Sequence, residues 1–176
     1  MVGIDTTLPF LPLNIAVGTV SDTRTIESDK SGDLLISLLT EAGHHNTERA
    51  VVHDDVVSLR SKIAAWIAQP EIDVILTTGG TGLTGRDVTP EAIMPLFEKQ
   101  IDGFSIAFHM ISYEIIKTST LHSRACAGIA NSTYIFCLPG SPNGCRDGWN
   151  KILKWQLDSR YRPCNFVSII PRLSER

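Results

Sequence analysis

The sequence has no long hydrophobic run and no excess of positive charge. No stretch of about 18 consecutive apolar residues occurs, which argues against a transmembrane helix. Sixteen basic and nineteen acidic residues give a formal net charge of −3, which is not typical of a protein that binds nucleic acid over a broad face. The first thirteen residues lack a basic segment and contain Asp5, Pro9 and Pro12, so we expect no signal peptide. A cytoplasmic protein with a small ligand, and with neither a membrane nor a nucleic acid as partner, is predicted.

Cysteine is also scarce, and the spacing of the cysteines indicates neither a CxxC pair nor a zinc site. The chain of 176 residues has four cysteines, which form neither a CxxC pair nor a zinc-binding pattern: Cys126, Cys137, Cys145 and Cys164. Cys126 and Cys137 lie in apolar runs, where a free thiol usually acts as a small hydrophobic group. A chain of this length can bury a core without disulfides. We therefore expect reduced thiols and one ordinary folded domain.

Apolar runs of strand length alternate with helical patterns along the chain. Strands are expected at residues 14–20, 50–52, 73–78 and 132–138. Helices are expected around Leu34–Ala42, around Leu59–Ile67, over Phe104–Ile116 and over Cys145–Gln156. A further helix is expected to begin with Thr89 as its N-cap and to carry Leu96 and Phe97 on its apolar face. This alternation predicts an α/β fold with a mainly parallel sheet and helices on both faces, although the Phe104–Ile116 helix and residues 119–131 are expected to interrupt it. No repeat or linker divides the chain, so we predict an N-terminal extension over residues 1–13 and a single domain over residues 14–176.

Four of the expected strands lead into polar or glycine-rich segments. These are Ser21–Arg24, His53–Asp55, Thr77–Gly82 with Arg86 and Asp87 beyond it, and Pro139–Pro142. Ligands of open α/β sheets bind outside the carboxyl ends of the strands. The four segments therefore predict one composite site.

The glycine loop fits several patterns. Residues Gly80–Gly85 match GxGxxG, but a dinucleotide fold places this motif after the first strand, directly before a helix. The glycine spacing also matches a Walker A loop, yet Arg86-Asp87 replaces the required Lys-Ser/Thr. The simplest alternative is a tight turn, which would not need Gly79, Gly80 and Gly82 together. We favour an anion-binding nest of backbone N–H groups.

Asp54 and Asp87 are the candidate metal ligands. Aspartates at these places often cap helices, but Asp55 and Thr89 are expected to do so here. Two carboxylates beside an anion nest would repel a phosphate unless a cation lies between them, and Mg²⁺ is the usual one. Among the other polar residues, His44 and His45 are interpreted as surface residues. Arg124 is interpreted either as a phosphate ligand or as a solvated charge.

The residues at the glycine loop closely resemble the signature of the MoaB/MogA family of molybdenum cofactor biosynthesis proteins. The resemblance is carried by Thr77-Thr78-Gly79-Gly80-Thr81-Gly82 and by Arg86-Asp87-Val88-Thr89-Pro90-Glu91-Ala92. It extends to Val20–Thr23, Gly103-Phe104, Ser119–Arg124 and Leu138–Pro142, and covers about residues 14–165. Residues 157–166 resemble the MoaB branch in particular.

The resemblance implies a three-layer, MogA-like fold that binds molybdopterin. It further implies adenylylation of molybdopterin with Mg-ATP and release of pyrophosphate, with Asp54 and Asp87 in catalysis and Mg²⁺ binding. The implied substrate-binding residues are Ser21, Thr78, Gly79, Gly80, Thr81, Gly82, Ser123, Arg124, Pro139, Gly140 and Ser141. A non-catalytic pterin-binding homologue and an unrelated nucleotide enzyme are the alternatives.

The resemblance also implies an oligomer, because the family forms trimers and the MoaB branch forms hexamers. We therefore expect a homotrimer or a dimer of trimers, with other cofactor-biosynthesis proteins as further partners. Trp155 lies off the apolar face formed by Trp149 and Ile152. It is interpreted either as an anchor at a subunit contact or as a tryptophan lying on its own helix.

Overall fold

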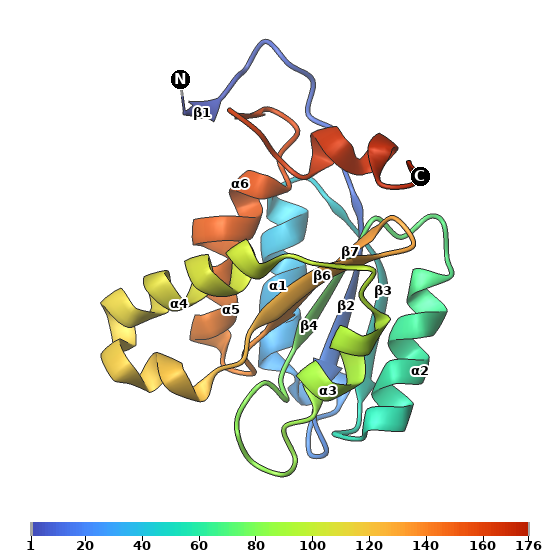
Figure 1. The fold of residues 1–176 in the computed structure, drawn as a ribbon, viewed down its shortest axis with the longest axis vertical. Coiled ribbons are helices and arrows are strands. Elements are labelled where there is room, and N and C mark those ends of the chain that lie inside the picture. The colour runs from blue at the N-terminus through green and yellow to red at the C-terminus, as the bar shows by residue number, and fades with distance from the viewer. Residues whose placement is uncertain (1, 176) are drawn as a thin grey trace.

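The central feature of the structure, a computed structural model that describes residues 2–175, is a six-stranded sheet (Figure 1). Across the sheet the strands are β3 (His45–Val52), β2 (Asn14–Val20), β4 (Val74–Thr78), β7 (Thr133–Leu138), β6 (Cys126–Ala130) and β5 (Lys99–Gln100). The first four run parallel to one another. β6 is antiparallel to both β7 and β5.

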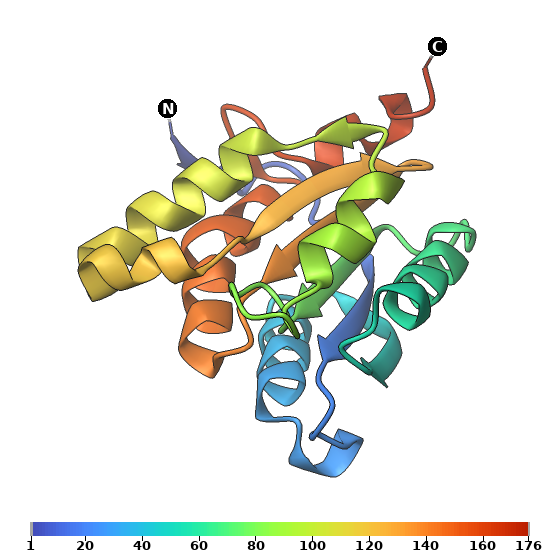
Figure 2. The ribbon, with the colours of Figure 1, turned by 60° about the horizontal axis from the view of Figure 1, so that its bottom comes forward.

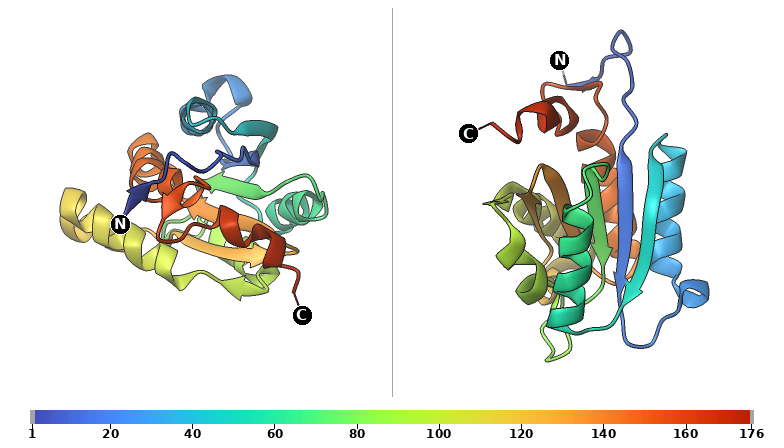
Figure 3. Two further views of the ribbon diagram at one scale, coloured as in Figure 1. Left: turned by 90° about the horizontal axis from the view of Figure 1, so that it is seen from above. Right: turned by 90° about the vertical axis from the view of Figure 1, so that its right-hand side faces the viewer.

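Helices cover both faces of this sheet, as the views in Figure 2 and Figure 3 show. The helices α1 (Lys30–Glu41), α4 (Asp102–Ile116) and α5 (Pro142–Gly148) share one buried cluster with the sheet. The helices α2 (Val56–Ile67) and α3 (Thr89–Ile93) share the other. Along β2, Ile15 and Val17 join the first cluster and Ala16 joins the second, as expected for alternating side chains. The predicted α/β fold with three layers is confirmed.

The order of the strands brings the expected site segments to one edge. β2 lies between β3 and β4, so the chain passes from β2 to β3 on one side and then crosses back to β4 on the other side, which is the arrangement of a topological switch point. The carboxyl ends of the parallel strands β3, β2, β4 and β7 lie side by side. The predicted clustering of the four strand exits is therefore confirmed.

One strand prediction needs correction, and the expected interruption of the alternation is found. The strand expected at residues 50–52 is the end of the eight-residue strand β3. Its first half, His45–Arg49, is polar because β3 is an edge strand that remains partly exposed. The alternation is interrupted at residues 119–131, as expected, because this segment contains the antiparallel strand β6. The strand itself was not predicted, since its small residues Ala127 and Gly128 hid it from the sequence pattern.

The start of α2 agrees with the sequence prediction, whereas the start of α3 differs from it. Asp55 caps α2 by accepting a hydrogen bond from the Ser58 N–H (2.7 Å), as predicted. Thr89 is not an N-cap: α3 begins at Thr89 itself, and the Thr89 hydroxyl donates to the Gly79 carbonyl (2.8 Å). Leu96 and Phe97 also lie beyond α3, which ends at Ile93 because a 3₁₀ turn containing Pro95 follows.

The interpretation of His44 as a surface residue is wrong. His44 is buried, and its Nδ1 accepts a hydrogen bond from the Leu13 N–H (3.2 Å). Its ring lies between Phe10, at a centroid distance of 5.2 Å, and Trp149, at 6.2 Å. Burial lowers the pKa of His44 to about 4. The sequence missed this because Phe10 lies in the expected N-terminal extension, far from His44 along the chain.

The segments near the two termini lie at the end of the domain opposite the strand exits (Figure 1). Within residues 1–13, β1 (Gly3–Ile4) pairs with β8 (Tyr161–Arg162) in a separate two-stranded sheet. The helix after β7 runs from α5 through a π-helical stretch, Trp149–Leu153, into α6 (Lys154–Gln156). Among residues 2–175, no helix combines the length and the apolar character needed to cross a membrane.

Candidate active site at the strand exits

The glycine loop after β4 packs directly against the neighbouring strand exits. Gly79 and Gly80 have φ values of +102° and +62°, which residues with a side chain rarely adopt. A Cβ atom on Gly80 would lie 3.3 Å from Asp54 Oδ1, and one on Gly140 would lie 3.2 Å from the Gly79 Cα. The loop therefore needs glycine for its conformation and for the close approach of its neighbours.

Part of the glycine-loop backbone is used to build the turn. The Gly79 N–H donates to the Leu138 carbonyl (3.1 Å), and the Gly80 carbonyl accepts from the Thr89 N–H (2.9 Å). Within residues 2–175, no acceptor contacts the N–H groups of Gly80 and Thr81. These two N–H groups are the ones left for the anion nest that the sequence predicts, and the nest stays a prediction.

Asp87 closes the far side of the same loop. Its Oδ2 accepts hydrogen bonds from the Thr84 N–H (2.9 Å) and the Thr84 hydroxyl (2.6 Å). Partial burial opposes its ionisation, but the bonds from Thr84 and Gly82 and the charge of Arg124 outweigh burial, so the pKa of Asp87 is lowered. Asp87 is therefore ionised at neutral pH, and it shapes the loop as well as carrying charge.

Asp54 faces this loop from the exit of β3. Partial burial and the negative charge of Asp87 raise the pKa of Asp54, and His53 opposes the shift. The two carboxylates thus repel each other across the glycine loop. Beside them, Asp22 forms an ion pair with Arg86, and its Oδ1 lies 3.4 Å from His53 Nδ1.

This pair of carboxylates suits Mg²⁺ better than a metal held by protein ligands alone. Within residues 2–175, no group of three or more His, Cys, Asp or Glu residues could hold a metal ion. Mg²⁺ typically takes one or two carboxylates and completes its coordination with water and substrate phosphate. Burial raises the pKa of Asp54 most, and the charge of Asp87 adds to this shift; such a cation would relieve the like-charge repulsion.

A cavity of 580 Å³ opens next to the glycine loop, between α4 and α5. Phe108, Ile115 and Ile116 supply an apolar wall. Seven of the predicted site residues line the cavity: Thr81, Gly82, Asp87, Ser123, Pro139, Gly140 and Ser141. The structure therefore brings these seven together around one space.

Two residues that line this cavity carry buried hydroxyls with no hydrogen-bond partner among the described residues. They are Ser123 Oγ, which the sequence singled out, and Thr120 Oγ1, which it did not. An unpaired buried hydroxyl is costly, and a bound ligand can pair with it. The cluster of hydroxyl residues in Lys117–Ser123 was the signal available in the sequence.

The remaining predicted residues lie around the cavity instead of lining it. Thr78 is buried, and its hydroxyl donates to the Pro139 carbonyl (2.8 Å). Ser21 Oγ accepts from the N–H groups of Thr23 and Arg24, both at 3.2 Å. Both residues therefore shape neighbouring loops, while Asp54, Gly79 and Gly80 form the adjacent edge of the site.

Arg124 is not a solvated charge, which was one of the two roles considered from the sequence. Its guanidinium donates to the carbonyls of Gly82 (2.8 Å) and Asp87 (2.8 Å). It also pairs with Glu91 of α3. Arg124 thus holds the glycine loop and Asp87 against the segment that leads into β6.

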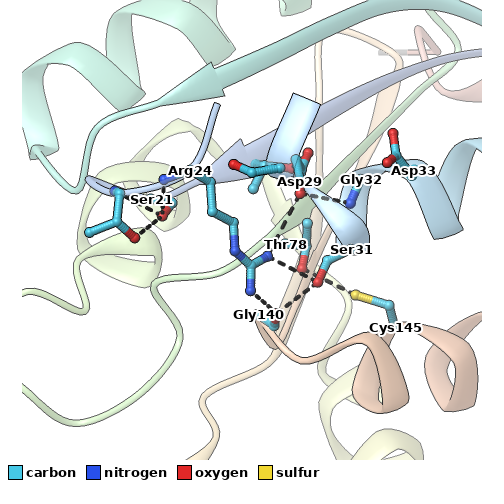
Figure 4. Close-up of polar contacts among 12 residues, drawn as sticks. Ser21, Arg24, Asp29, Ser31, Gly32, Asp33, Thr78, Gly140 and Cys145 are labelled. Carbon is cyan, nitrogen blue, oxygen red and sulfur yellow. Dashed lines mark hydrogen bonds and ion pairs between the residues drawn. The ribbon is translucent and has the colours of Figure 1, made fainter. Parts of the chain in front are cut away.

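A polar network that sequence reasoning missed holds the turn after β7 (Figure 4). Ser31 Oγ donates to the Gly140 carbonyl (2.8 Å), and Arg24 donates to the same oxygen (3.3 Å). Behind them lies the fully buried carboxylate of Asp29. No local spacing reveals this contact, because Arg24 and Gly140 are 116 positions apart.

Comparison with known proteins agrees with this geometry. The family model described as "Probable molybdopterin binding domain" matches residues 15–159, which is most of the chain. The chain belongs to this molybdopterin-binding domain family. Its role therefore lies in molybdenum cofactor biosynthesis.

Relatives within this family cover nearly the whole chain. Molybdenum cofactor biosynthesis protein B of Escherichia coli K12 is 50% identical over 157 residues, covering 89% of this chain and 92% of the relative. A crystal structure of a molybdenum cofactor biosynthesis protein B is 43% identical, with a TM-score of 0.81 and coverage of 84% of this chain and 92% of the other. The tungsten cofactor synthesizing protein MoaB from Pyrococcus furiosus is 38% identical, with a TM-score of 0.70 and coverage of 81% and 91%.

Proposed function

We propose that this protein binds molybdopterin and adenylylates it with Mg-ATP, releasing pyrophosphate. The observation that carries the proposal is the pair of carboxylates, Asp54 and Asp87, which face each other across a glycine loop with free N–H groups. The loop borders a cavity with an apolar wall and with two lining residues, Thr120 and Ser123, whose buried hydroxyls are unpaired among the described residues; such a cavity suits a flat heterocycle with polar edges.

The chemistry of this transfer matches the residues that are present. An oxygen of the molybdopterin phosphate attacks the α-phosphorus of ATP, and the bond to the leaving pyrophosphate breaks. The attacking phosphate is already anionic at neutral pH, so no serine, cysteine or histidine nucleophile is needed. Such transfers depend mainly on positioning and on neutralising charge.

Each part of the site has a separate task in this proposal. The N–H groups of Gly80 and Thr81 bind phosphate oxygens, and the cavity between α4 and α5 orients the pterin. Asp54 and Asp87 would hold Mg²⁺, which supplies positive charge to the polyphosphate. Arg124 keeps the glycine loop in place through its carbonyl contacts.

We also infer a trimer or a dimer of trimers, with α4 as a contact between copies. Ile106, Met110 and Tyr113 follow one another at helical spacing on α4, and all three side chains are exposed. Trp155, the candidate anchor named from the sequence, packs against Tyr161 of its own chain at a centroid distance of 5.8 Å. The α4 stripe therefore offers the larger exposed apolar surface.

Incubation of the purified protein with molybdopterin and Mg-ATP tests the proposal. We expect pyrophosphate release that requires both substrates and stops when the metal is chelated. Molybdopterin binding without pyrophosphate release would instead support a binding protein of the same pathway. Absence of molybdopterin binding would contradict both functions.

A further inference from the structure

The turn after β7 is held from outside the cavity by two donors on a distant part of the chain. Ser31 Oγ, in the first turn of α1, and the guanidinium of Arg24 both donate to the Gly140 carbonyl, at 2.8 Å and 3.3 Å. Arg24 also donates to Ser31 Oγ (3.1 Å), so the two donors form one unit (Figure 4).

This contact sets the direction of the peptide between Gly140 and Ser141. That peptide is trans, so its N–H points opposite to its carbonyl. Because the Gly140 carbonyl points toward Arg24 and Ser31, the Ser141 N–H points away from them. Within residues 2–175, no acceptor contacts this N–H, and both Gly140 and Ser141 line the cavity.

Arg24 itself is fixed on two sides. Its backbone N–H donates to Ser21 Oγ (3.2 Å), and its guanidinium lies 3.7 Å from the Asp29 carboxylate. Asp29 is fully buried and accepts from the Thr19 hydroxyl (2.6 Å) and the Gly32 N–H (3.0 Å). The guanidinium therefore has a rigid support at the exit of β2, next to the glycine loop.

We propose that Arg24 and Ser31 are positioning residues that orient the Gly140–Ser141 peptide for molybdopterin binding. This inference rests on the proposed function, and it concerns ligand affinity more than folding. The fixed peptide presents an N–H group to an anionic or carbonyl group of the ligand. Without its two donors the peptide can rotate, and the ligand would then have to order it on binding.

Arg49 offers a matched control because it contacts the same buried carboxylate from the other side. Its guanidinium lies 3.2 Å from Asp29 Oδ2 and 2.8 Å from Asp33, and it makes no contact with Gly140. Arg49→Ala therefore removes a cation from Asp29 and leaves the Gly140 carbonyl held. A general loss of stability around Asp29 should appear in this variant as well.

The test compares Arg24→Ala, Ser31→Ala, their double variant and Arg49→Ala by molybdopterin titration and by urea unfolding. We expect the Kd to rise about tenfold in each of the first two variants, and by less than the product of the two effects in the double variant. Arg49→Ala should bind within about twofold of wild type even where its unfolding midpoint falls, because it leaves Gly140 unchanged.

Three results with the variants would overturn the inference. Wild-type affinity in both Arg24→Ala and Ser31→Ala would show that the peptide needs no positioning. Equal weakening in Arg49→Ala would show a general structural effect. A loss confined to Arg24→Ala, with Ser31→Ala unaffected, would show that Arg24 contacts the ligand directly. If wild-type protein fails to bind molybdopterin, the proposed function fails and this inference fails with it.

Discussion

Asp22 and Asp54 exchange two hydrogen bonds across the exits of β2 and β3. The Asp22 N–H donates to Asp54 Oδ2 (3.0 Å), and the Asp54 N–H donates to Asp22 Oδ1 (3.1 Å). This exchange aligns the Asp54 carboxylate and leaves its Oδ1 on the side of Gly80. Asp22 in turn pairs with Arg86, which lies beyond the glycine loop. The two loops that flank the candidate active site are thus joined through one aspartate.

Replacement of Asp54 by asparagine should separate catalysis from folding. An asparagine can still accept the hydrogen bond from Asp22, so the loop should keep its shape. The loss of negative charge should reduce adenylyl transfer about 100-fold or more and leave molybdopterin affinity within a few-fold of wild type. Asp55→Asn is the control, because it removes a neighbouring charge and retains a good N-cap. Full turnover in Asp54→Asn would refute the catalytic assignment.

Two glycines of the same loop should respond differently to alanine. A Cβ atom on Gly82 would lie 2.6 Å from Asp87 Oδ2, whereas one on Gly85 would meet nothing within 4 Å. Gly82→Ala should therefore displace the Asp87 carboxylate and lower turnover at least about tenfold, while Gly85→Ala should behave like wild type. Steady-state kinetics on the two variants provide the test. Equal activity in both would show that the position of Asp87 is unimportant.

The sequence predicted those features that depend on neighbouring residues. The strand and the glycine loop could be predicted because their signals lie in consecutive residues, the buried run Val74–Thr78 and the segment Arg86–Ala92. The contact of Arg24 with Gly140 and the burial of His44 under Phe10 arise only when distant segments pack together. The role of Arg124 was missed for the same reason, because its partners Gly82 and Asp87 belong to another loop.

The exposed stripe on α4 should be required for assembly. Met110→Glu places a charge in the centre of this stripe, so the oligomer should dissociate into smaller species in light scattering at micromolar concentration. Val57→Glu is the control, since Val57 is equally exposed but lies on α2, on the other face of the sheet. Wild-type protein that is already monomeric would rule out the assembly. Dissociation by Val57→Glu alone would place the contact on α2.

The stability of the protein should fall on mild acidification because of His44. Burial holds its pKa at about 4 in the folded state, against 6.5 in the unfolded chain. Between these values only the unfolded chain binds the proton, so stability is full above pH 6.5 and decreases toward pH 4. The loss of unfolding free energy on acidification is at most about 3 kcal/mol in the wild-type protein. It should be smaller in the His44→Leu variant. Urea unfolding at pH 7 and pH 4.5 measures this loss, and His45→Gln is the control because His45 is exposed. The same pH dependence in His44→Leu as in the wild-type protein would contradict the assignment to His44.

Thr120 offers a test of the cavity that does not involve the carboxylates. Its buried hydroxyl has no partner among the described residues, so Thr120→Val should leave the unfolding free energy unchanged or raise it by up to about 1 kcal/mol. If the hydroxyl pairs with the pterin, the same variant should bind molybdopterin about three- to tenfold more weakly. Thr118→Val serves as control, because Thr118 is exposed in the same 3₁₀ helix and does not line the cavity. Loss of stability with unchanged affinity would mean that the hydroxyl serves the fold, and the pterin would then have to occupy another part of the site.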